Sequence, residues 1–333
     1  MILGYILRRI ASSIITLLFL SFIIFVVIAL PPGDYAEQIM HQRQAETGRI
    51  ISDSDIQNIR IRLGLDRPLL EQYATWMRNI ITEGDFGFSF RYFAPVMEVI
   101  NARLPFTALL VVITLFFTYF IAVPIGVYSA VRQYSLGDYF FTFIGYIGLA
   151  IPNFLTALIL LYFSATVFNI SVGGLFSPEY ANAAWSLAKV WDLFQHMWVP
   201  VVVLAFSGTA FQIRVVRATL LDELNQLYVT AARARGIPER RLLWKYPVRV
   251  SLNPLISTIG WELSGIISGA PIVALVLAIP DTGPLFLKSL QDQDMYLAGT
   301  MLLILSILII IGTLISDMLL AAFDPRIRLG YGR

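Results

Sequence analysis

The sequence contains no cysteine and only two histidines, His41 and His196, which lie far apart along the chain. The absence of cysteine excludes a disulfide, a thiolate nucleophile and a cysteine metal site. Redox and zinc chemistry are therefore not expected. Charge is also scarce, because only 14% of the residues are charged and the formal net charge is +2. So small an excess of positive charge does not indicate a nucleic-acid partner.

Apolar residues make up 57% of the chain, against roughly 45–50% in ordinary soluble domains. They gather in long runs instead of scattering, and a helix needs about 20 such residues to cross a bilayer. The pattern predicts an all-α membrane protein with six transmembrane helices. The predicted spans are residues 10–30, 104–130, 141–168, 198–221, 251–279 and 297–323.

The first run is longer than a secretory signal core, and Pro31-Pro32-Gly33-Asp34 is not a typical cleavage site, so we expect an uncleaved anchor. Arg214 and Arg217 lie near the end of the fourth run and are expected to extend towards water.

The predicted organisation has four parts. Residues 1–30 form a tail and the first span, 31–103 an extracytoplasmic loop domain, 104–323 a five-helix core with a cytoplasmic loop at 219–250, and 324–333 a cytoplasmic tail. Residues 214–249 hold eight lysines and arginines against three acidic residues. Because cations favour the cytoplasmic side, we expect both termini to be cytoplasmic. In the loop domain, helices are predicted at 53–63 and 68–81, with a turn at Gly84-Asp85-Phe86-Gly87.

Motifs for catalysis are missing from the sequence. A phosphate-binding loop needs Gly-Lys-Ser or Gly-Lys-Thr, but Lys189, Lys245 and Lys288 follow alanine, tryptophan and leucine. The sequence also has no Gly-x-Ser-x-Gly elbow. We therefore expect a protein that is not itself an enzyme and binds no cofactor.

The cationic loop has the most informative pattern. Its apolar residues recur at helical spacing, which predicts one helix up to Gly236 and a second that begins near Pro238. These apolar residues are Leu220, Leu224, Leu227, Tyr228 and Ala231. The alanines beside Gly236 would let another protein approach closely, so the loop is interpreted as a docking elbow. Contact of its arginines with anionic lipid is an equally compatible interpretation.

The sequence from Thr230 to Arg241, TAARARGIPERR, followed by Asn253-Pro254, resembles the cytoplasmic loop of permease subunits in ATP-binding-cassette (ABC) importers of the peptide, opine and nickel type. Further stretches agree in order along nearly the whole chain. They are residues 63–69 (LGLDRPL), 84–89 (GDFGFS), 104–107 (LPFT), 151–154 (IPNF) and 324–328 (DPRIR).

The resemblance implies a type I importer permease fold in a bacterial or archaeal cytoplasmic membrane. Its implied partners are a second, homologous permease in a heterodimer, two cytoplasmic ATPases that bind ATP and Mg, and an extracytoplasmic solute-binding protein. Transport would proceed by ATP-driven alternating access. Residues of the loop would couple this chain to the ATPases; they are Tyr228, Thr230, Ala231, Ala232, Ala234, Arg235, Gly236, Ile237, Pro238, Arg240 and Arg241.

In and beside the cytoplasmic loop, two positions depart from the family pattern. Thr230 stands where relatives commonly have glutamate, and Pro247 should interrupt the helix between the elbow and the fifth span.

Polar residues inside the predicted spans are candidates for the solute path. Glu262 lies near the middle of the fifth run, where a lone carboxylate is costly unless it faces a cavity or a partner. Asn153 and Gln212 are further candidates, although each could instead bond to a neighbouring helix. Asp317 is expected to pair with an arginine, and the small residues of 264–269 are expected to pack against another helix.

Peptides are the expected solute, with opines, oligosaccharides or a nickel chelate as alternatives. An ion-coupled secondary transporter would usually carry several intramembrane acids or histidines, and it is less favoured, as is a membrane scaffold.

Overall fold

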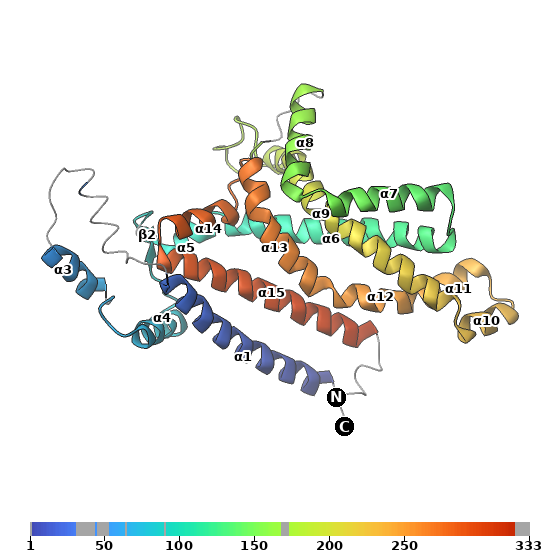
Figure 1. The fold of residues 1–333 in the computed structure, drawn as a ribbon, viewed down its shortest axis with the longest axis horizontal. Coiled ribbons are helices and arrows are strands. Elements are labelled where there is room, and N and C mark those ends of the chain that lie inside the picture. Colours follow the sequence, from blue (N-terminus) through green and yellow to red (C-terminus); the bar gives the residue numbers. More distant parts are fainter. Residues whose placement is uncertain are drawn as a thin grey trace. The chain divides into compact units, whose positions relative to one another are not determined.

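The computed structural model describes residues 2–30, 44, 53–63, 65–89, 91–167 and 173–323. Within these ranges the chain is mostly helical (Figure 1). It divides into two compact units. Unit 1 comprises residues 1–11, 106–283 and 309–333, and unit 2 comprises residues 12–105 and 284–308. The terminal motif at 324–328 lies outside the described residues. The predicted four-part division of the chain stays a prediction.

Within the described residues, five helices are long and apolar enough to cross a membrane. They are α1 (Ile2–Ala29), α6 (Leu104–Val131), α9 (Leu187–Leu224), α13 (Ile259–Val276) and α15 (Met295–Phe323). A sixth span is obtained if the bent pair α7 (Leu136–Ala150) and α8 (Asn153–Thr166) is taken together. The described part of the chain thus confirms an all-α membrane fold with up to six spans.

The sequence predicted one continuous helix for the third run, but in the structure this run is divided into two helices. Helices α7 and α8 meet at an angle of 108°. Ile151 adopts an extended conformation with φ −90° and ψ 124° before Pro152. Proline lacks a backbone N–H and disfavours helical geometry in the residue before it, which explains the break.

The fourth run extends further than predicted at its amino end. Helix α9 has 38 residues, or roughly 57 Å of helix. Its N-cap is Ser186, whose hydroxyl accepts a hydrogen bond from the Lys189 N–H at 3.2 Å. The cap starts the helix well before the apolar run does, because capping depends on the polar residue at the terminus.

The fifth run is also divided, into α12 (Pro247–Ser257) and α13, with Thr258 between them. The Thr258 hydroxyl donates to the Leu255 carbonyl at 2.8 Å, and Thr258 has ψ −3°. A threonine side chain that bonds to the preceding turn competes with regular helix geometry. Glu262 consequently lies in the first turn of α13, not in the middle of a helix. The predicted interruption at Pro247 is confirmed, since this residue begins α12.

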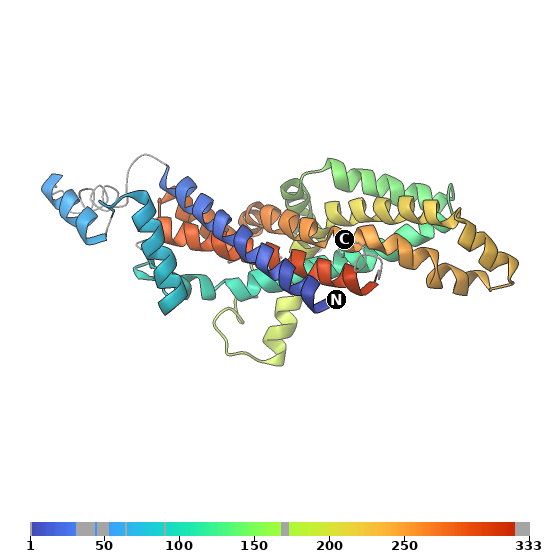
Figure 2. The same ribbon diagram turned by 90° about the horizontal axis from the view of Figure 1, so that it is seen from below.

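Unit 1 contains a core beneath the cationic loop. It joins Val127 of α6, Val216 and Leu220 of α9, and Val248 and Leu255 of α12, all buried. Figures 1 and 2 show α10 (Leu227–Ala234) and α11 (Glu239–Lys245) where α9 ends and α12 begins. The elbow therefore stands on a packed base of three helices.

Unit 2 contains α3 (Asp53–Leu63), α4 (Leu69–Glu83), α5 (Val96–Asn101) and parts of α1, α6, α14 (Thr282–Gln291) and α15. Strands β1 (Phe88–Ser89) and β2 (Ala94–Pro95) pair antiparallel. The helices predicted at 53–63 and 68–81 are confirmed. So is the glycine turn, since Gly84 has φ +67° and Gly87 φ +96°.

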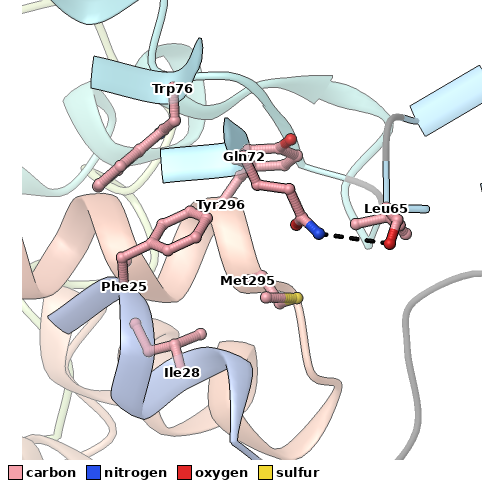
Figure 3. Close-up of a pocket in the computed structure, with 8 residues that line it drawn as sticks. Phe25, Ile28, Leu65, Gln72, Trp76, Met295 and Tyr296 are labelled. Carbon is pink, nitrogen blue, oxygen red and sulfur yellow. Dashed lines mark hydrogen bonds between the residues drawn. The ribbon is translucent and has the colours of Figure 1, made fainter. Parts of the chain in front are cut away.

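The core of unit 2 is aromatic and aliphatic. Trp76 of α4 and Phe25 of α1 are buried together with Leu303 of α15. Figure 3 shows Phe25, Trp76 and Tyr296 beside an apolar pocket, with the Gln72 amide directed at the Leu65 carbonyl, 3.3 Å away. These contacts hold α4 against the two membrane helices of the unit.

Candidate coupling elbow and intramembrane polar cluster

The cationic loop folds as a helix, a tight turn and a second helix. Helix α10 ends at Ala234, Gly236 has φ +74°, and Pro238 is the N-cap of α11. The Gly236 N–H donates to the Arg233 carbonyl at 2.9 Å, and the Ile237 N–H to the Ala232 carbonyl at 3.3 Å. Such bonds close a helix end when the residue past it is left-handed.

One prediction for the first helix of this loop is wrong. The periodic residues from Leu220 to Ala231 do not form one helix, because α9 ends at Leu224 and α10 begins at Leu227. Asn225 and Gln226 lie between them, and Gln226 has an extended conformation with ψ 147°. The elbow is therefore set off from α9 by its own turn.

A small core holds α10 and α11 together. Val229 and Leu242 are fully buried, and Ala232 is 8% exposed. Ile237 and Tyr246 pack against them. Of the three alanines expected on an open face, Ala232 instead points inward, while Ala231 and Ala234 are exposed.

The remaining predicted coupling residues lie on the outer surface of the elbow. Ile237 is half-buried. The exposed ones are Tyr228, Thr230, Arg235, Gly236, Pro238, Arg240 and Arg241. Leu227 and Trp244 are also exposed, by 86% and 53%, so the surface combines apolar and cationic side chains.

Two side-chain contacts link the helices of the elbow to each other and to α9. Arg233 Nη2 lies 2.7 Å from Glu239 Oε1, linking α10 to α11 across Gly236. This hydrogen bond lowers the pKa of Glu239 and raises the pKa of Arg233. The Tyr228 hydroxyl donates to Glu223, the last acidic residue of α9, and burial together with this bond raises the pKa of Tyr228.

Two predicted path residues meet inside unit 1. Gln212 of α9 is fully buried, and its Nε2 donates to Glu262 Oε1 and to the Thr258 hydroxyl, each at 2.8 Å. The Tyr119 hydroxyl of α6 lies 3.4 Å from the Thr258 hydroxyl, just before α13, and donates to the Leu255 carbonyl of α12 at 3.3 Å. The cluster thereby joins α6, α9 and α13 at the break after α12.

A glycine makes room for this cluster. A Cβ atom at Gly208 would lie 2.7 Å from Glu262 Oε2, so only glycine lets the carboxylate approach α9 this closely. The sequence pattern did not identify Gly208, Thr258 or Tyr119 as part of the site. Their roles depend on how three helices pack, and no local spacing signals them.

Asn153, the third predicted path residue, lies apart at the start of α8. Its Oδ1 accepts a bond from the Ser207 hydroxyl of α9 at 3.3 Å. The small-residue prediction is only partly right. Gly269 lies close to Asn153 and Leu204, whereas Gly265 has no neighbour that an added Cβ would touch, and Ser268 is exposed.

The two charged predictions at the ends of the spans have different outcomes. Asp317 pairs with Arg9, as predicted. The sequence predicted that Arg217 extends into water, and this prediction is wrong. Arg217 Nη2 instead lies 2.9 Å from Asp138 Oδ2 of α7. Asp138 lies 79 residues earlier in the chain, so the position of Arg217 near a span end could not reveal its partner.

Comparison with known proteins gives matches along the chain. The model of the family described as binding-protein-dependent transport system inner membrane component matches residues 122–329. The corresponding N-terminal model matches residues 2–111.

Several curated relatives are matched over nearly their full length. An oligopeptide transport system permease protein of Bacillus subtilis is 37% identical over 97% of this chain and 99% of its own. A putative peptide permease protein of Brucella ovis is 32% identical over 98% of this chain and 99% of its own. A dipeptide transport system permease protein of Lactococcus lactis is 28% identical over 98% of this chain and 99% of its own. This chain belongs to the family of binding-protein-dependent transport system inner membrane components.

Proposed function

We propose that this permease subunit imports peptides in an ABC importer, through ATP-driven alternating access. The relatives named above as oligopeptide, peptide and dipeptide permeases support this choice of solute. The alternative solutes are opines, oligosaccharides or a nickel chelate carried by the same machinery. An ion-coupled transporter is less favoured because the exposed surface of the elbow suits docking to a separate ATPase, and a scaffold is less favoured because the relatives named above are transport permeases.

The proposed assembly pairs this chain with a second, homologous permease in a heterodimer. Two ATPase subunits bind ATP and Mg at the cytoplasmic face, and an extracytoplasmic binding protein delivers the solute. In this proposal the chain binds no cofactor and catalyses no bond chemistry. Both termini and the elbow face the cytoplasm of a bacterium or archaeon, which agrees with the cationic composition of residues 214–249.

The elbow is the proposed contact with the ATPase, and its geometry is the observation that carries the proposal. Ala231 and Ala234 are exposed beside Gly236, where a Cβ would meet nothing within 4 Å. A partner can therefore approach the backbone closely at this point. The buried core of Val229 and Leu242 keeps the elbow rigid, so a displacement of its surface is passed to α9 and α12.

Passage of solute beside Asn153, Gln212 and Glu262 is also a proposal. Support comes from the Glu262 carboxylate, since the described hydrogen bond from Gln212 reaches Oε1 and leaves Oε2 over Gly208. A retained carboxylate in a membrane helix commonly marks a transport path or a structural partner. Binding energy from ATP would favour one access state, and hydrolysis would release it.

Site-directed cross-linking tests the docking of the elbow. The chain has no native cysteine, so a cysteine at Ala234 is the only thiol of this subunit. In the assembled complex it should cross-link to an ATPase subunit, while a cysteine at the matched exposed alanine Ala181, before the N-terminus of α9, should not. Equal cross-linking at both positions, or none at Ala234, would contradict the proposal.

A further inference from the structure

Helix α7 follows α9 closely because both carry small residues where they meet. A Cβ at Gly148 would lie 3.2 Å from the Phe206 carbonyl, and one at Gly145 would lie 3.9 Å from the Ala210 Cβ. The two backbones therefore approach each other along the second half of α7. Packing between such apolar surfaces rests on van der Waals contacts, which hold the spacing between the helices but resist sliding weakly.

An ion pair at the start of α7 adds a directional contact. Arg217 Nε donates to Asp138 Oδ1 and Nη2 donates to Oδ2, each at 2.9 Å. Asp138 is 2% exposed. A two-pronged guanidinium–carboxylate contact fixes relative orientation as well as distance, and a buried carboxylate that lost it would be left uncompensated.

The same carboxylate also holds the turn between α6 and α7. The Tyr134 N–H donates to Asp138 Oδ2 at 3.0 Å, and Tyr134 has φ +63°. A tyrosine in the left-handed region is strained, so the turn needs contacts that hold it. Asp138 thus connects the α6–α7 turn to α9.

The Asp138–Arg217 pair contacts α9 close to the elbow. Arg217 lies about two turns before Leu224, where α9 ends and the elbow begins. Its neighbour Val216 lies against Gly126 of α6, where an added Cβ would lie 2.6 Å from the Val216 Cβ. A displacement of the elbow reaches this section of α9 before the rest of the helix.

The other end of α7 lies at the 108° bend before α8. Asn153, the first residue of α8, bonds to Ser207 of α9, and a Cβ at Gly269 of α13 would lie 3.3 Å from Asn153 Nδ2. Helix α7 therefore connects the ion pair near the elbow to a junction of α8, α9 and α13.

We propose that Asp138 and Arg217 form a positioning pair that makes α7 move with α9, so that a displacement of the elbow reaches the α7–α8 bend. The proposal rests on the docking of the elbow to the ATPase. Neither residue contacts solute or ATP in this account. Their effect is on how much transport each hydrolysed ATP produces.

The test uses the assembled complex in vesicles, with solute uptake and ATP hydrolysis measured together. Asp138→Asn keeps the size of the side chain but removes one acceptor and the charge, and Arg217→Lys keeps the charge but loses the two-pronged contact. Both should retain the ATPase subunits and hydrolyse ATP, while uptake per ATP falls about fivefold or more. Arg132→Gln, which removes an exposed cation from the same turn, should leave this ratio unchanged.

Three outcomes would overturn the inference. Uptake per ATP equal to that of the wild type in both variants would show that the pair does not couple the helices. Uptake and hydrolysis that fall together with the amount of assembled complex, or failure of both variants to assemble, would make the pair a folding contact only. The docking proposal fails on a different observation, namely when ATPase subunits show no cross-link to the elbow.

Discussion

At the scale of single residues, the backbone conformation of Gly236 matters more than the space around it. Its φ of +74° lies in the left-handed region, while a Cβ would meet nothing within 4 Å. A side chain here is therefore opposed by backbone strain and not by a clash within the chain. Two substitutions can separate this strain from the demands of a docked partner.

Gly236→Val should weaken coupling. A β-branched residue resists the left-handed region, at a cost above the roughly 1–2 kcal/mol typical of other residues, and the turn between α10 and α11 would change. We expect reduced co-purification of the ATPase subunits, or ATP hydrolysis without uptake. Co-purification is measured on the purified complex, and ATP hydrolysis and uptake are measured in vesicles.

Gly236→Asn is the matched control, because asparagine tolerates this conformation. Recovery of coupling in the asparagine variant would assign the effect to backbone geometry. A loss in both variants would mean that the partner contacts the backbone where any side chain obstructs it. Wild-type assembly and transport in the valine variant would remove Gly236 from the proposed coupling mechanism.

Glu262 allows a second test at this scale. Glu262→Gln keeps an oxygen that can accept the bond from Gln212 but removes any charge. If Glu262 faces the solute path, this variant should assemble normally yet change the uptake rate or the range of solutes, measured by competition in vesicles. Glu262→Ala leaves the buried Gln212 amide without this partner and should lower stability by about 1–3 kcal/mol.

The outcome of this pair of variants is decisive for the role of the residue. Normal transport in Glu262→Gln, together with lower thermal stability in Glu262→Ala, would make the carboxylate a structural hydrogen-bonding group. The path proposal for Glu262 would then be wrong.

At the scale of elements, the apolar runs predicted the helices well, but their interruptions only in part. The break before α8 follows from Pro152, which the sequence displays. The break at Thr258 depends on a hydroxyl that bonds to the preceding turn. Threonines inside helices often do not interrupt the helix, so the sequence did not predict this break. The Asp138–Arg217 and Gln212–Glu262 contacts join distant helices, so periodicity along one helix could not predict them.

The start of α15 provides a stability prediction at this scale. Asp294 is fully buried, and its carboxylate accepts bonds from the Ser89 hydroxyl at 2.6 Å and from the N–H groups of Arg91 and Leu297. Asp294→Asn replaces an acceptor by a donor, so it should destabilise unit 2 by about 1–3 kcal/mol. Thermal unfolding of the detergent-purified protein measures the change.

Asp292→Asn is the control for this variant. Asp292 pairs with Arg91 and Lys288, but these cations are about 45% exposed. Such surface pairs contribute about 0–1 kcal/mol. An equal or larger fall in unfolding temperature for Asp292→Asn would show that the buried network at Asp294 does not hold strand β1 to the start of α15.

At the scale of the whole molecule, the direction of insertion can be measured with single cysteines. In the proposed topology Asp85 lies outside and Arg235 inside the cytoplasmic membrane. A cysteine at Asp85 should react with an impermeant thiol reagent on intact cells, and one at Arg235 only after the inner face is opened. Both positions are exposed in the structure, so burial does not mask the comparison. The reverse labelling pattern would invert the proposed orientation.

The most direct measurement of the central claim is peptide uptake into vesicles that contain the complete complex. The account predicts accumulation only when ATP is supplied on the elbow side and the solute-binding protein on the opposite side, and no ATP hydrolysis by this chain alone. Uptake driven by a proton or sodium gradient without ATP would instead identify an ion-coupled transporter. Such a result, or peptide uptake that is independent of the ATPase subunits, would contradict the account.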